Sequence, residues 1–398
     1  MSGNFQRVPM GEVATFKTGK LDSNAAVENG AYPFFTCSRD TFRTNTYSFD
    51  DEVVLLAGNN ANGIYPLKYF KGKFDAYQRT YVIRPIDESR LDTRFLYFAL
   101  RPQLDHLRSV STGSATKFLT MGLLSNLELP LPDLPTQRKI AGILSAYDDL
   151  IENNLRRIKI LEEMAQSLFR EWFVHFRFPG HESAKFEDSP LGLIPKSWNA
   201  TMLGEFVDNK SVHLQTGPFG TQFKASLYSH EGTPVINVRN IGFGTLRAEK
   251  LEFLPPDKVD ELKRHQLRSG NIVFGRKGAV ERHLSVGPVE DGWIQGSDCI
   301  RLRVVSGPLT PRFLSIGFRE AEHQRWMMNQ CSGGATMASL NQDILCRIPL
   351  AVPHPELIAK FDKFSTSAVD QVDVLASKIQ TLRRTRDLLL PKLLKSDA

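Results

Sequence analysis

The sequence contains one unit twice. Residues 113–131 read GSATKFLTMGLLSNLELPL, and residues 333–352 read GGATMASLNQDILCRIPLAV. The matching residues are Gly113, Ala115, Thr116 and Leu119 in the first copy and Gly333, Ala335, Thr336 and Leu340 in the second. Upstream, FDAYQRTYVIR (74–84) aligns with WIQGSDCIRLR (293–303), and DDEVVLL (50–56) aligns with SGNIVFG (269–275). Two diverged copies predict two related domains, suited to a partner with two related halves.

The composition agrees with a two-domain globular protein. The chain has 398 residues, which is long for one core, and 41% of them are hydrophobic. Its net charge of +6 fits a polyanionic partner, although many proteins carry a similar excess for no specific reason. No apolar stretch reaches the roughly 18 residues of a membrane span, and no signal peptide opens the chain. We therefore expect a cytoplasmic protein with no membrane partner. The cysteines lack CxxC spacing and are expected to be reduced.

A long amphipathic helix is expected after each copy. In residues 135–173 and again in residues 355–394, apolar side chains recur at alternating steps of four and three, as in a coiled-coil seam. The first seam consists of Ile140, Leu144, Tyr147, Ile151, Asn154, Ile158, Leu161, Ala165, Leu168 and Trp172. The second consists of Phe361, Phe364, Ala368, Val372, Leu375, Ile379, Leu382 and Leu389. Asn154 either fixes the register of the seam or points to solvent, and the sequence does not separate these alternatives.

These observations predict an α+β fold. Two pseudo-symmetric globular domains are expected to be separated by an antiparallel coiled coil of the two long helices, because each helix needs a partner to bury its seam. We assign residues 1–134 to the first domain and residues 135–180 to the central helix. Residues 181–353 would form a linker and the second domain, and residues 354–398 the C-terminal helix.

Motifs for catalysis are absent from the sequence. It contains no GxxxxGK[ST] phosphate loop, no HExxH metal motif and no GxSxG nucleophile motif. It also lacks the Asn/Asp-Pro-Pro-aromatic motif expected of a methyltransferase that acts on an exocyclic amine. We therefore predict a binding protein with no catalytic residue, no metal site and no cofactor site.

Several expected loops have a composition suited to duplex DNA. They combine Arg or Lys with Asn, Gln, Ser, Thr and aromatic residues, which are the side chains that contact base edges and phosphates. An ordinary solvated surface would explain any one loop, but matched loops on two related domains favour DNA. The candidate DNA-binding residues are Arg39, Arg43, Asn45, Lys68, Lys71, Arg79, Lys117, Arg239, Asn240, Arg276, Lys277 and Arg282.

The chain closely resembles the specificity subunits of Type I restriction–modification enzymes. Residues 129–173, LPLPDLPTQRKIAGILSAYDDLIENNLRRIKILEEMAQSLFREWF, look like the family's central conserved region. Residues 189–198, SPLGLIPKSW, look like the start of its second recognition domain. GSAT (113–116) and GGAT (333–336) stand where the family has a Gly- and Ser/Thr-rich stretch. The second helix lacks the QRKIA core of the first.

The resemblance implies a function. Each globular domain would be a target recognition domain for one half of a split site in double-stranded DNA. The helices would set the unread spacer and dock two adenine-N6 methyltransferase subunits, and restriction/translocase subunits would join the complex. S-adenosylmethionine, ATP and Mg would belong to those partners. The alternatives are a methylation-only or Type IIB-like system, a coiled-coil adaptor that reads no DNA, and a nuclease whose site the motif search misses.

Overall fold

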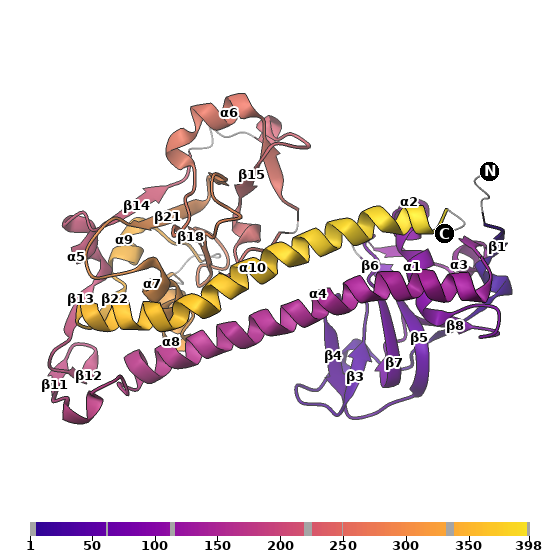
Figure 1. The fold of residues 1–398 in the computed structure, drawn as a ribbon, viewed down its shortest axis with the longest axis horizontal. Helices are drawn as coiled ribbons and strands as arrows, with labels where there is room; N and C mark the ends of the chain where they lie inside the picture. The colour runs from indigo at the N-terminus through magenta and orange to yellow at the C-terminus, as the bar shows by residue number, and fades with distance from the viewer. Residues whose placement is uncertain are drawn as a thin grey trace. The chain divides into compact units, whose positions relative to one another are not determined.

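The computed structural model describes residues 5–60, 63–111, 116–218, 225–248, 250–331 and 338–395 (Figure 1). It divides into two compact units. The first unit comprises Met1–Asn153 with Ile379–Ala398, and the second comprises Asn154–Lys378. Most of the repeated GSAT and GGAT stretches, residues 113–115 and 333–336, lie outside the described residues. Among the described residues, no helix is both long enough and apolar enough to cross a membrane.

The first unit is built on a mixed sheet in the order β2-β8-β5-β7-β3-β4. These strands are β2 (Ala14–Thr18), β8 (Thr80–Pro85), β5 (Phe49–Ala57), β7 (Leu67–Ala76), β3 (Tyr32–Phe35) and β4 (Thr41–Thr44). The pairing of β3 with β7 is parallel, and the other pairings are antiparallel. Helix α1 (Thr93–Leu100) packs on β5 and β7, with the Asp92 carboxylate accepting a hydrogen bond from the Phe95 amide at its start. Helix α2 (Leu104–Val110) follows α1.

The second unit contains a sheet in the order β14-β21-β18-β19-β16 and a smaller one in the order β17-β15-β20. The larger sheet consists of β14 (Val212–Thr216), β21 (Cys299–Val304), β18 (Ile272–Gly275), β19 (His283–Ser285) and β16 (Phe243–Gly244). The smaller sheet consists of β17 (Glu252–Leu254), β15 (Thr233–Ile236) and β20 (Ile294–Gln295). This unit also contains the hairpin β11 (Phe186–Ser189) and β12 (Gly192–Pro195), and helices α5 (Leu203–Asp208), α6 (Pro256–Glu261), α7 (Pro311–Gly317) and α8 (Ala321–Cys331).

The sequence repeat is a structural repeat. The order β2-β8-β5 in the first unit corresponds to β14-β21-β18 in the second. The small sheet of β1 (Arg7–Pro9) and β10 (Glu128–Pro130) corresponds to that of β13 (Asn199–Met202) and β22 (Pro349–Val352). Short helices α3 (Met121–Ser125) and α9 (Gln342–Cys346) precede β10 and β22. The Met10 amide donates to the Leu127 carbonyl at 2.8 Å, and the Leu203 amide donates to the Ile348 carbonyl at 2.9 Å.

Strand register corrects one part of the sequence alignment. Ala57 lies opposite Thr80, and Gly275 lies opposite Cys299. The alignment of residues 74–84 with 293–303 is therefore confirmed, because it equates Thr80 with Cys299. The alignment of residues 50–56 with 269–275 is wrong by one residue, since it equates Leu56 rather than Ala57 with Gly275. A one-residue shift exchanges the two faces of a strand, and only the pairing partner fixes it.

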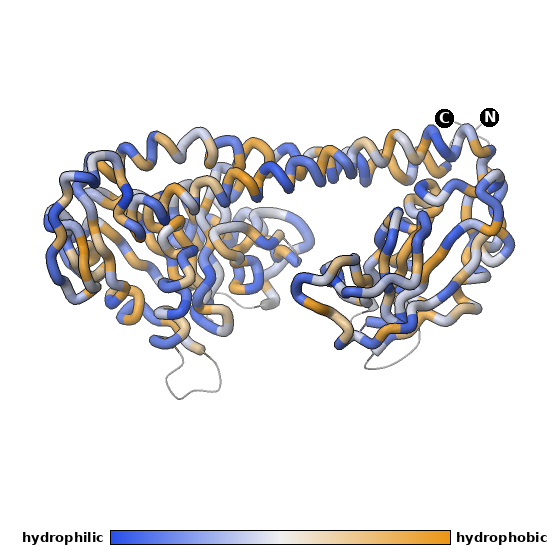
Figure 2. The backbone as a smooth tube through the Cα atoms, turned by 90° about the horizontal axis from the view of Figure 1, so that it is seen from below, coloured by the Kyte–Doolittle hydropathy of each residue, from blue (hydrophilic) through white to orange (hydrophobic). Residues whose placement is uncertain are grey.

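The expected long helices are α4 (Leu134–Phe169), which ends in a π-helical turn (Arg170–Val174), and α10 (Pro355–Leu393). Every residue of the first seam is buried or half-buried, and apolar positions recur along both helices (Figure 2). Asn154 is 8% exposed, so it does not point to solvent. The second seam is wrong at Phe364, which is 66% exposed, because Ser365 takes the inward position at 2% exposure. The Ser365 hydroxyl donates to the Phe361 carbonyl, which satisfies its donor inside the protein.

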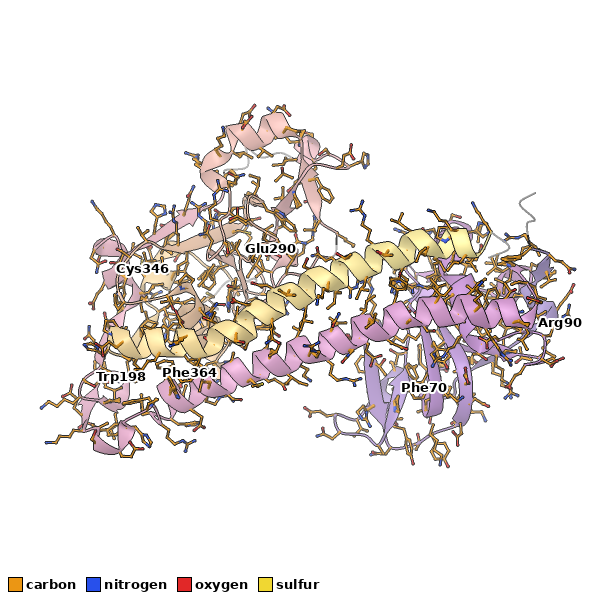
Figure 3. The ribbon with its side chains drawn as sticks, in the orientation of Figure 1. Phe70, Arg90, Trp198, Glu290, Cys346 and Phe364 are labelled. Carbon is orange, nitrogen blue, oxygen red and sulfur yellow. The ribbon has the colours of Figure 1, made fainter. Side chains whose placement is uncertain are left out.

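Segments of α4 and α10 pack together within each unit. In the first, Ile140 and Leu144 of α4 share a core with Leu390 of α10, while Asp148 pairs with Arg386. Residues later in α4 therefore contact residues earlier in α10, which confirms that the two helices run antiparallel. In the second unit, Trp172 packs edge-on against Phe361 and Phe364 of α10. Phe364 lies on α10, as labelled in Figure 3.

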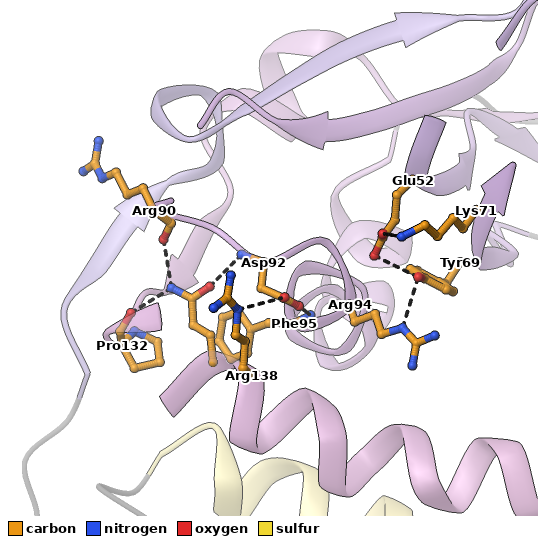
Figure 4. Close-up of polar contacts among 10 residues, drawn as sticks. Glu52, Tyr69, Lys71, Arg90, Asp92, Arg94, Phe95, Pro132 and Arg138 are labelled. Carbon is orange, nitrogen blue, oxygen red and sulfur yellow. Dashed lines mark hydrogen bonds and ion pairs between the residues drawn. The ribbon is translucent and has the colours of Figure 1, made fainter. Parts of the chain in front are cut away.

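The start of α4 is held by Gln137, which is fully buried. Its Oε1 accepts a hydrogen bond from the Asp92 amide at 2.8 Å, and its Nε2 donates to the carbonyls of Arg90 and Pro132 at 2.9 and 2.8 Å (Figure 4). Asp133 caps the helix by accepting from the Thr136 amide, and hydrogen bonds from the side chain and the amide of Thr136 lower the pKa of its carboxyl group. Gln137 therefore ties α4 to the start of α1.

Candidate nucleic-acid interface

The β3–β4 hairpin and β7 bring several of the candidate residues of the first unit together. Lys68 extends from β7 toward the hairpin, where its Nζ donates to the Asp40 carbonyl at 2.8 Å and to Thr41 Oγ1 at 3.2 Å. It also lies 5.6 Å from the centre of the Phe35 ring. Burial lowers the pKa of the Lys68 amine. Lys68 thus fastens the hairpin to β7, and Arg39 lies exposed in the turn between β3 and β4.

Two other candidate residues hold the hairpin in shape. The Arg43 guanidinium donates to the carbonyls of Gly30 and Ala31 at 2.5 and 2.8 Å. The Asn45 side-chain oxygen accepts from the Ala31 amide at 3.3 Å. Both side chains therefore satisfy backbone groups of their own loop, which is a structural task that the sequence pattern did not reveal.

Lys71 belongs to a polar chain on the sheet (Figure 4). Its Nζ lies 2.8 Å from Glu52 Oε2, and Tyr69 donates from its hydroxyl to Glu52 Oε1 at 2.8 Å. Arg94 of α1 donates to the same hydroxyl at 3.0 Å. The hydrogen bond to Glu52 raises the pKa of Lys71, whose side chain is 71% exposed. Lys71 is accessible to an anion, but it already forms an ion pair with Glu52.

Arg79 and Lys117 meet at a second place in the first unit. Here β6 (Asn59–Asn60) pairs with β9 (Lys117–Phe118), next to the start of β8. The Gly58 amide donates to the Arg79 carbonyl, and the Leu119 amide donates to the Gly58 carbonyl, both at 2.8 Å. The exposed Arg79 guanidinium lies 5.5 Å from the centre of the Phe118 ring. We call Asn59, Arg79, Lys117 and Phe118 the first ledge.

The second unit has the same construction around Arg276 and Lys277. The Arg276 amide donates to the Asp298 carbonyl, and the Leu340 amide donates to the Arg276 carbonyl, both at 2.8 Å. Lys277 pairs with Ser339 as an isolated bridge, and its Nζ lies 3.5 Å from Asp298 Oδ1. The side chains of Lys277 and Asp298 are 59% and 49% exposed. We call Lys277, Asp298 and Ser339 the second ledge.

The other candidates of the second unit are dispersed. Arg239 forms an ion pair with Glu252 at 2.6 Å. Arg282 lies 5.2 Å from the centre of the Phe243 ring and 3.4 Å from Glu281. Asn240 is fully buried, and its amide side chain bonds the Asn237 amide and the Arg247 carbonyl. The polar atoms of Asn240 therefore hold the turn in this structure, and its contact with DNA stays a prediction.

The sequence search missed Phe118, Phe243 and Asp298. The two rings carry the guanidiniums of Arg79 and Arg282, which preorganises long side chains that would otherwise sample many rotamers. Asp298 is absent from the sequence candidates because these comprise only Arg, Lys and Asn residues. A signal was present, since the confirmed alignment of the two copies places Asp298 at the position of Arg79.

Histidines and cysteines do not form a metal-binding group among the described residues, where no cluster of three or more His, Cys, Asp or Glu side chains could hold an ion. Cys37, Cys299, Cys331 and Cys346 are all free thiols. Burial raises the pKa of Cys299 to about 12 and lowers that of His283 to about 3, so both groups are neutral near pH 7.

Comparison with known proteins agrees with this architecture. Residues 3–163 match the family described as Type I restriction modification DNA specificity domain. The chain is 29% identical over 369 residues to the Type I restriction enzyme EcoDI specificity subunit of Escherichia coli, an alignment that covers 88% of this chain and 78% of that protein. The chain is thus similar over most of its length to a Type I restriction enzyme specificity subunit, and its first 163 residues contain a match to the family's DNA specificity domain.

Other specificity subunits show the same similarity. The MjaVIII specificity subunit of Methanocaldococcus jannaschii is 28% identical over 249 residues, which cover 63% of this chain and 54% of that protein. The crystal structure of a Type I S subunit from M. genitalium shares the fold, with a TM-score of 0.61 over 99% of this chain and 97% of that one at 17% sequence identity. The family match of residues 3–163 includes the first ledge, the β3–β4 hairpin and most of α4.

Proposed function

We propose that this chain is the subunit that selects the DNA sequence for a Type I restriction–modification complex. Each unit carries one target recognition domain, and each domain binds one half of a bipartite site in double-stranded DNA. The domains fall at residues 1–134 and 181–353, with the helical regions at 135–180 and 354–398. The chain carries no catalytic residue, and it works in the cytoplasm, where the DNA is.

The structural repeat is the observation that supports this proposal most strongly. The two units share a strand order and equivalent backbone hydrogen bonds, yet their exposed side chains differ. A pair of such surfaces suits two different short sequences better than one symmetric sequence, since base identity is read by side chains and not by the backbone of the reader. Similarity to the Type I specificity subunits supplies the kind of target.

The side chains proposed to contact DNA include the exposed Arg39, Lys71, Arg79, Arg239 and Lys277 and the half-buried Lys117, Arg276 and Arg282. Arg39, Lys71, Arg79 and Lys117 would serve the first half-site, and Arg239, Arg276, Lys277 and Arg282 the second. Arg43, Asn45 and Lys68 would act mainly by shaping the β3–β4 hairpin, because they already bond its backbone or its Thr41 hydroxyl. Contacts from lysine and arginine to phosphates add affinity that falls with salt, whereas contacts to base edges add sequence preference.

The two long helices are proposed to set the unread spacer and to dock partner subunits. Both helices expose large apolar side chains outside their seams, among them Leu150, Ile160 and Met164 of α4 and Val374 of α10. Exposed apolar residues that recur along a helix suit a protein partner. The partners would be adenine-N6 methyltransferase subunits, two in number, and restriction/translocase subunits. S-adenosylmethionine, ATP and Mg would be bound by them.

Mapping of methylated bases tests this function. The chain is expressed with its methyltransferase subunit in a host that lacks other adenine methylation, and the modified positions are sequenced. We expect one motif with two defined blocks separated by a fixed number of unread bases. Methylation that follows no sequence, or one continuous motif, would contradict the proposal. The methyltransferase expressed without this chain is the control and should leave the motif unmodified.

A further inference from the structure

The two ledges offer a closer identification of the base-reading residues. Three segments that are distant in sequence meet at each ledge, and the same two backbone hydrogen bonds hold them together. Through these bonds Gly58 corresponds to Arg276, Arg79 to Asp298 and Leu119 to Leu340. Asn59 and Phe118 then correspond to Lys277 and Ser339, which pair across the equivalent position.

The backbone is the same at the two ledges, but the charges are not. The first ledge presents the exposed guanidinium of Arg79, while the amine of the half-buried Lys117 donates to the Arg108 carbonyl at 3.4 Å. At the position of Arg79 the second ledge presents the carboxylate of Asp298, and the nearby cation, Lys277, comes from the other strand. A shared frame with exchanged donor and acceptor groups is the arrangement needed to read two different base edges.

We propose, as a refinement that rests on the proposed function, that Arg79 and Asp298 are the specificity-determining residues of the two ledges. Arg79 would read a guanine in one half-site, and Asp298 would read a cytosine in the other. An arginine can donate two hydrogen bonds to guanine O6 and N7, and a carboxylate accepts from cytosine N4.

The surroundings of each side chain suit these tasks. Phe118 carries one face of the Arg79 guanidinium, which leaves its in-plane N–H groups available and limits its rotamers. Asp298 alone would be repelled by the phosphates of DNA. Lys277, 3.5 Å away, offsets that repulsion while the carboxylate remains 49% exposed.

The test uses the full chain with its methyltransferase subunit, first on host genomic DNA and then on duplexes varied at single positions. Arg79→Gln should relax the preference for guanine at one position of one half-site. Asp298→Asn should move the preference at one position of the other half-site from cytosine toward adenine, because an amide can pair with adenine N6 and N7. For Arg79→Gln the ratio of affinities for the cognate and the single-base variant should fall by about 5-fold to 150-fold, the range expected for one bidentate contact. For Asp298→Asn the fall should lie toward the lower end of that range, because the carboxylate accepts from cytosine N4 alone.

Matched controls lie on the same strands. Arg84 lies near the far end of β8, so Arg84→Gln removes the same positive charge as Arg79→Gln away from the first ledge and should leave the motif unchanged. Arg303 occupies the equivalent position on β21, so Arg303→Gln changes the charge of that strand away from the second ledge and should also leave the motif unchanged. Arg79→Lys, which keeps the charge but loses the paired donors, should also relax the guanine position. Thermal melting identifies any variant that fails to fold, and in that case the lysine variant decides the matter for the first ledge.

The outcomes separate this inference from the proposed function. A wild-type bipartite motif that persists in Arg79→Gln and Asp298→Asn would overturn the ledge assignment and leave the function standing. The same holds if these variants weaken binding equally for every sequence, since that is the behaviour of phosphate contacts. A wild-type complex without any sequence-defined motif would overturn both.

Discussion

Asp148 of α4 accepts a hydrogen bond from Arg386 of α10 inside the first unit. The same carboxylate lies 3.4 Å from Arg101, just after α1, and the Arg386 side chain is only 11% exposed. Leu390, one turn further along α10, is buried in the same core as Ile140. The end of the chain is therefore a structural part of the unit that contains its beginning.

Replacement of Arg386 should destabilise the first unit. Arg386→Ala leaves the half-buried Asp148 with only the longer contact to Arg101, and we expect a loss of about 1–3 kcal/mol, below the figure for a fully buried pair. Urea unfolding followed by circular dichroism measures the loss. The exposed neighbour Arg384, changed to Ala, is the control and should have little effect. Equal stability of the two variants would show that the ion pair contributes nothing.

The hydrogen bonds of Gln137 should contribute to the stability of the first unit beyond what its packing contributes. Gln137→Leu keeps most of the volume but leaves the Asp92 amide and the carbonyls of Arg90 and Pro132 without this partner, so we expect a loss of about 2–4 kcal/mol. Denaturant unfolding is the measurement, and Arg138→Ala on the exposed side of the same helical turn is the control. A leucine variant as stable as wild type would mean that water replaces all three contacts.

Acid should weaken the second unit through His283. This side chain is fully buried, packs against the rings of Phe274 and Phe318 and contacts the Ser315 hydroxyl, and burial lowers its pKa to about 3. Since the unfolded chain binds this proton near pH 6.5, the contribution of neutral His283 is present above that pH and is lost as the pH falls toward 3.

The melting temperature of the second unit should therefore decrease as pH falls below about 6.5. Burial contributes most to the low pKa of His283, and the nearby charges of Arg319 and His323 lower the same pKa further. His283→Gln cannot titrate and should show a shallower dependence over this range, even if its stability at pH 7 is lower. The same slope in wild type and variant would assign the acid sensitivity to other groups.

If α4 and α10 set the spacer, lengthening both should lengthen the unread DNA. Four residues inserted after Asn153 and four after Ala376 add about 6 Å of helix to each, close to two base pairs of B-DNA. We expect the motif to keep both blocks and to gain about two unread bases. A single insertion is the control and should impair folding or partner binding, because it shifts one seam against the other. An unchanged spacer in an active double-insertion variant would assign the spacing to other parts of the complex.

Local periodicity and internal similarity were enough to predict much of this molecule. The heptad steps from Ile140 to Trp172 predicted α4, because one face of a helix recurs every 3.6 residues and needs no knowledge of its partner. The repeat around Leu119 and Leu340 predicted two related units, and both leucines make the equivalent hydrogen bond. The resemblance carried by residues 129–173 predicted the family.

Tertiary structure alone decided the tasks of individual polar residues. Arg43 and Asn240 have the chemistry of DNA-binding side chains, yet they bond backbone groups that only the folded loops bring within reach. Ser365 rather than Phe364 faces inward, because the aromatic residues of α4 and α10 crowd that turn. Asp298 stands where Arg79 stands in the other unit only once strand register aligns the copies. A sequence contains the periodicity of each element. The choice of partner for a polar atom depends on contacts that exist only after folding, whether these span 13 residues, as between Arg43 and Gly30, or 50, as between Arg312 and the Asp362 carbonyl.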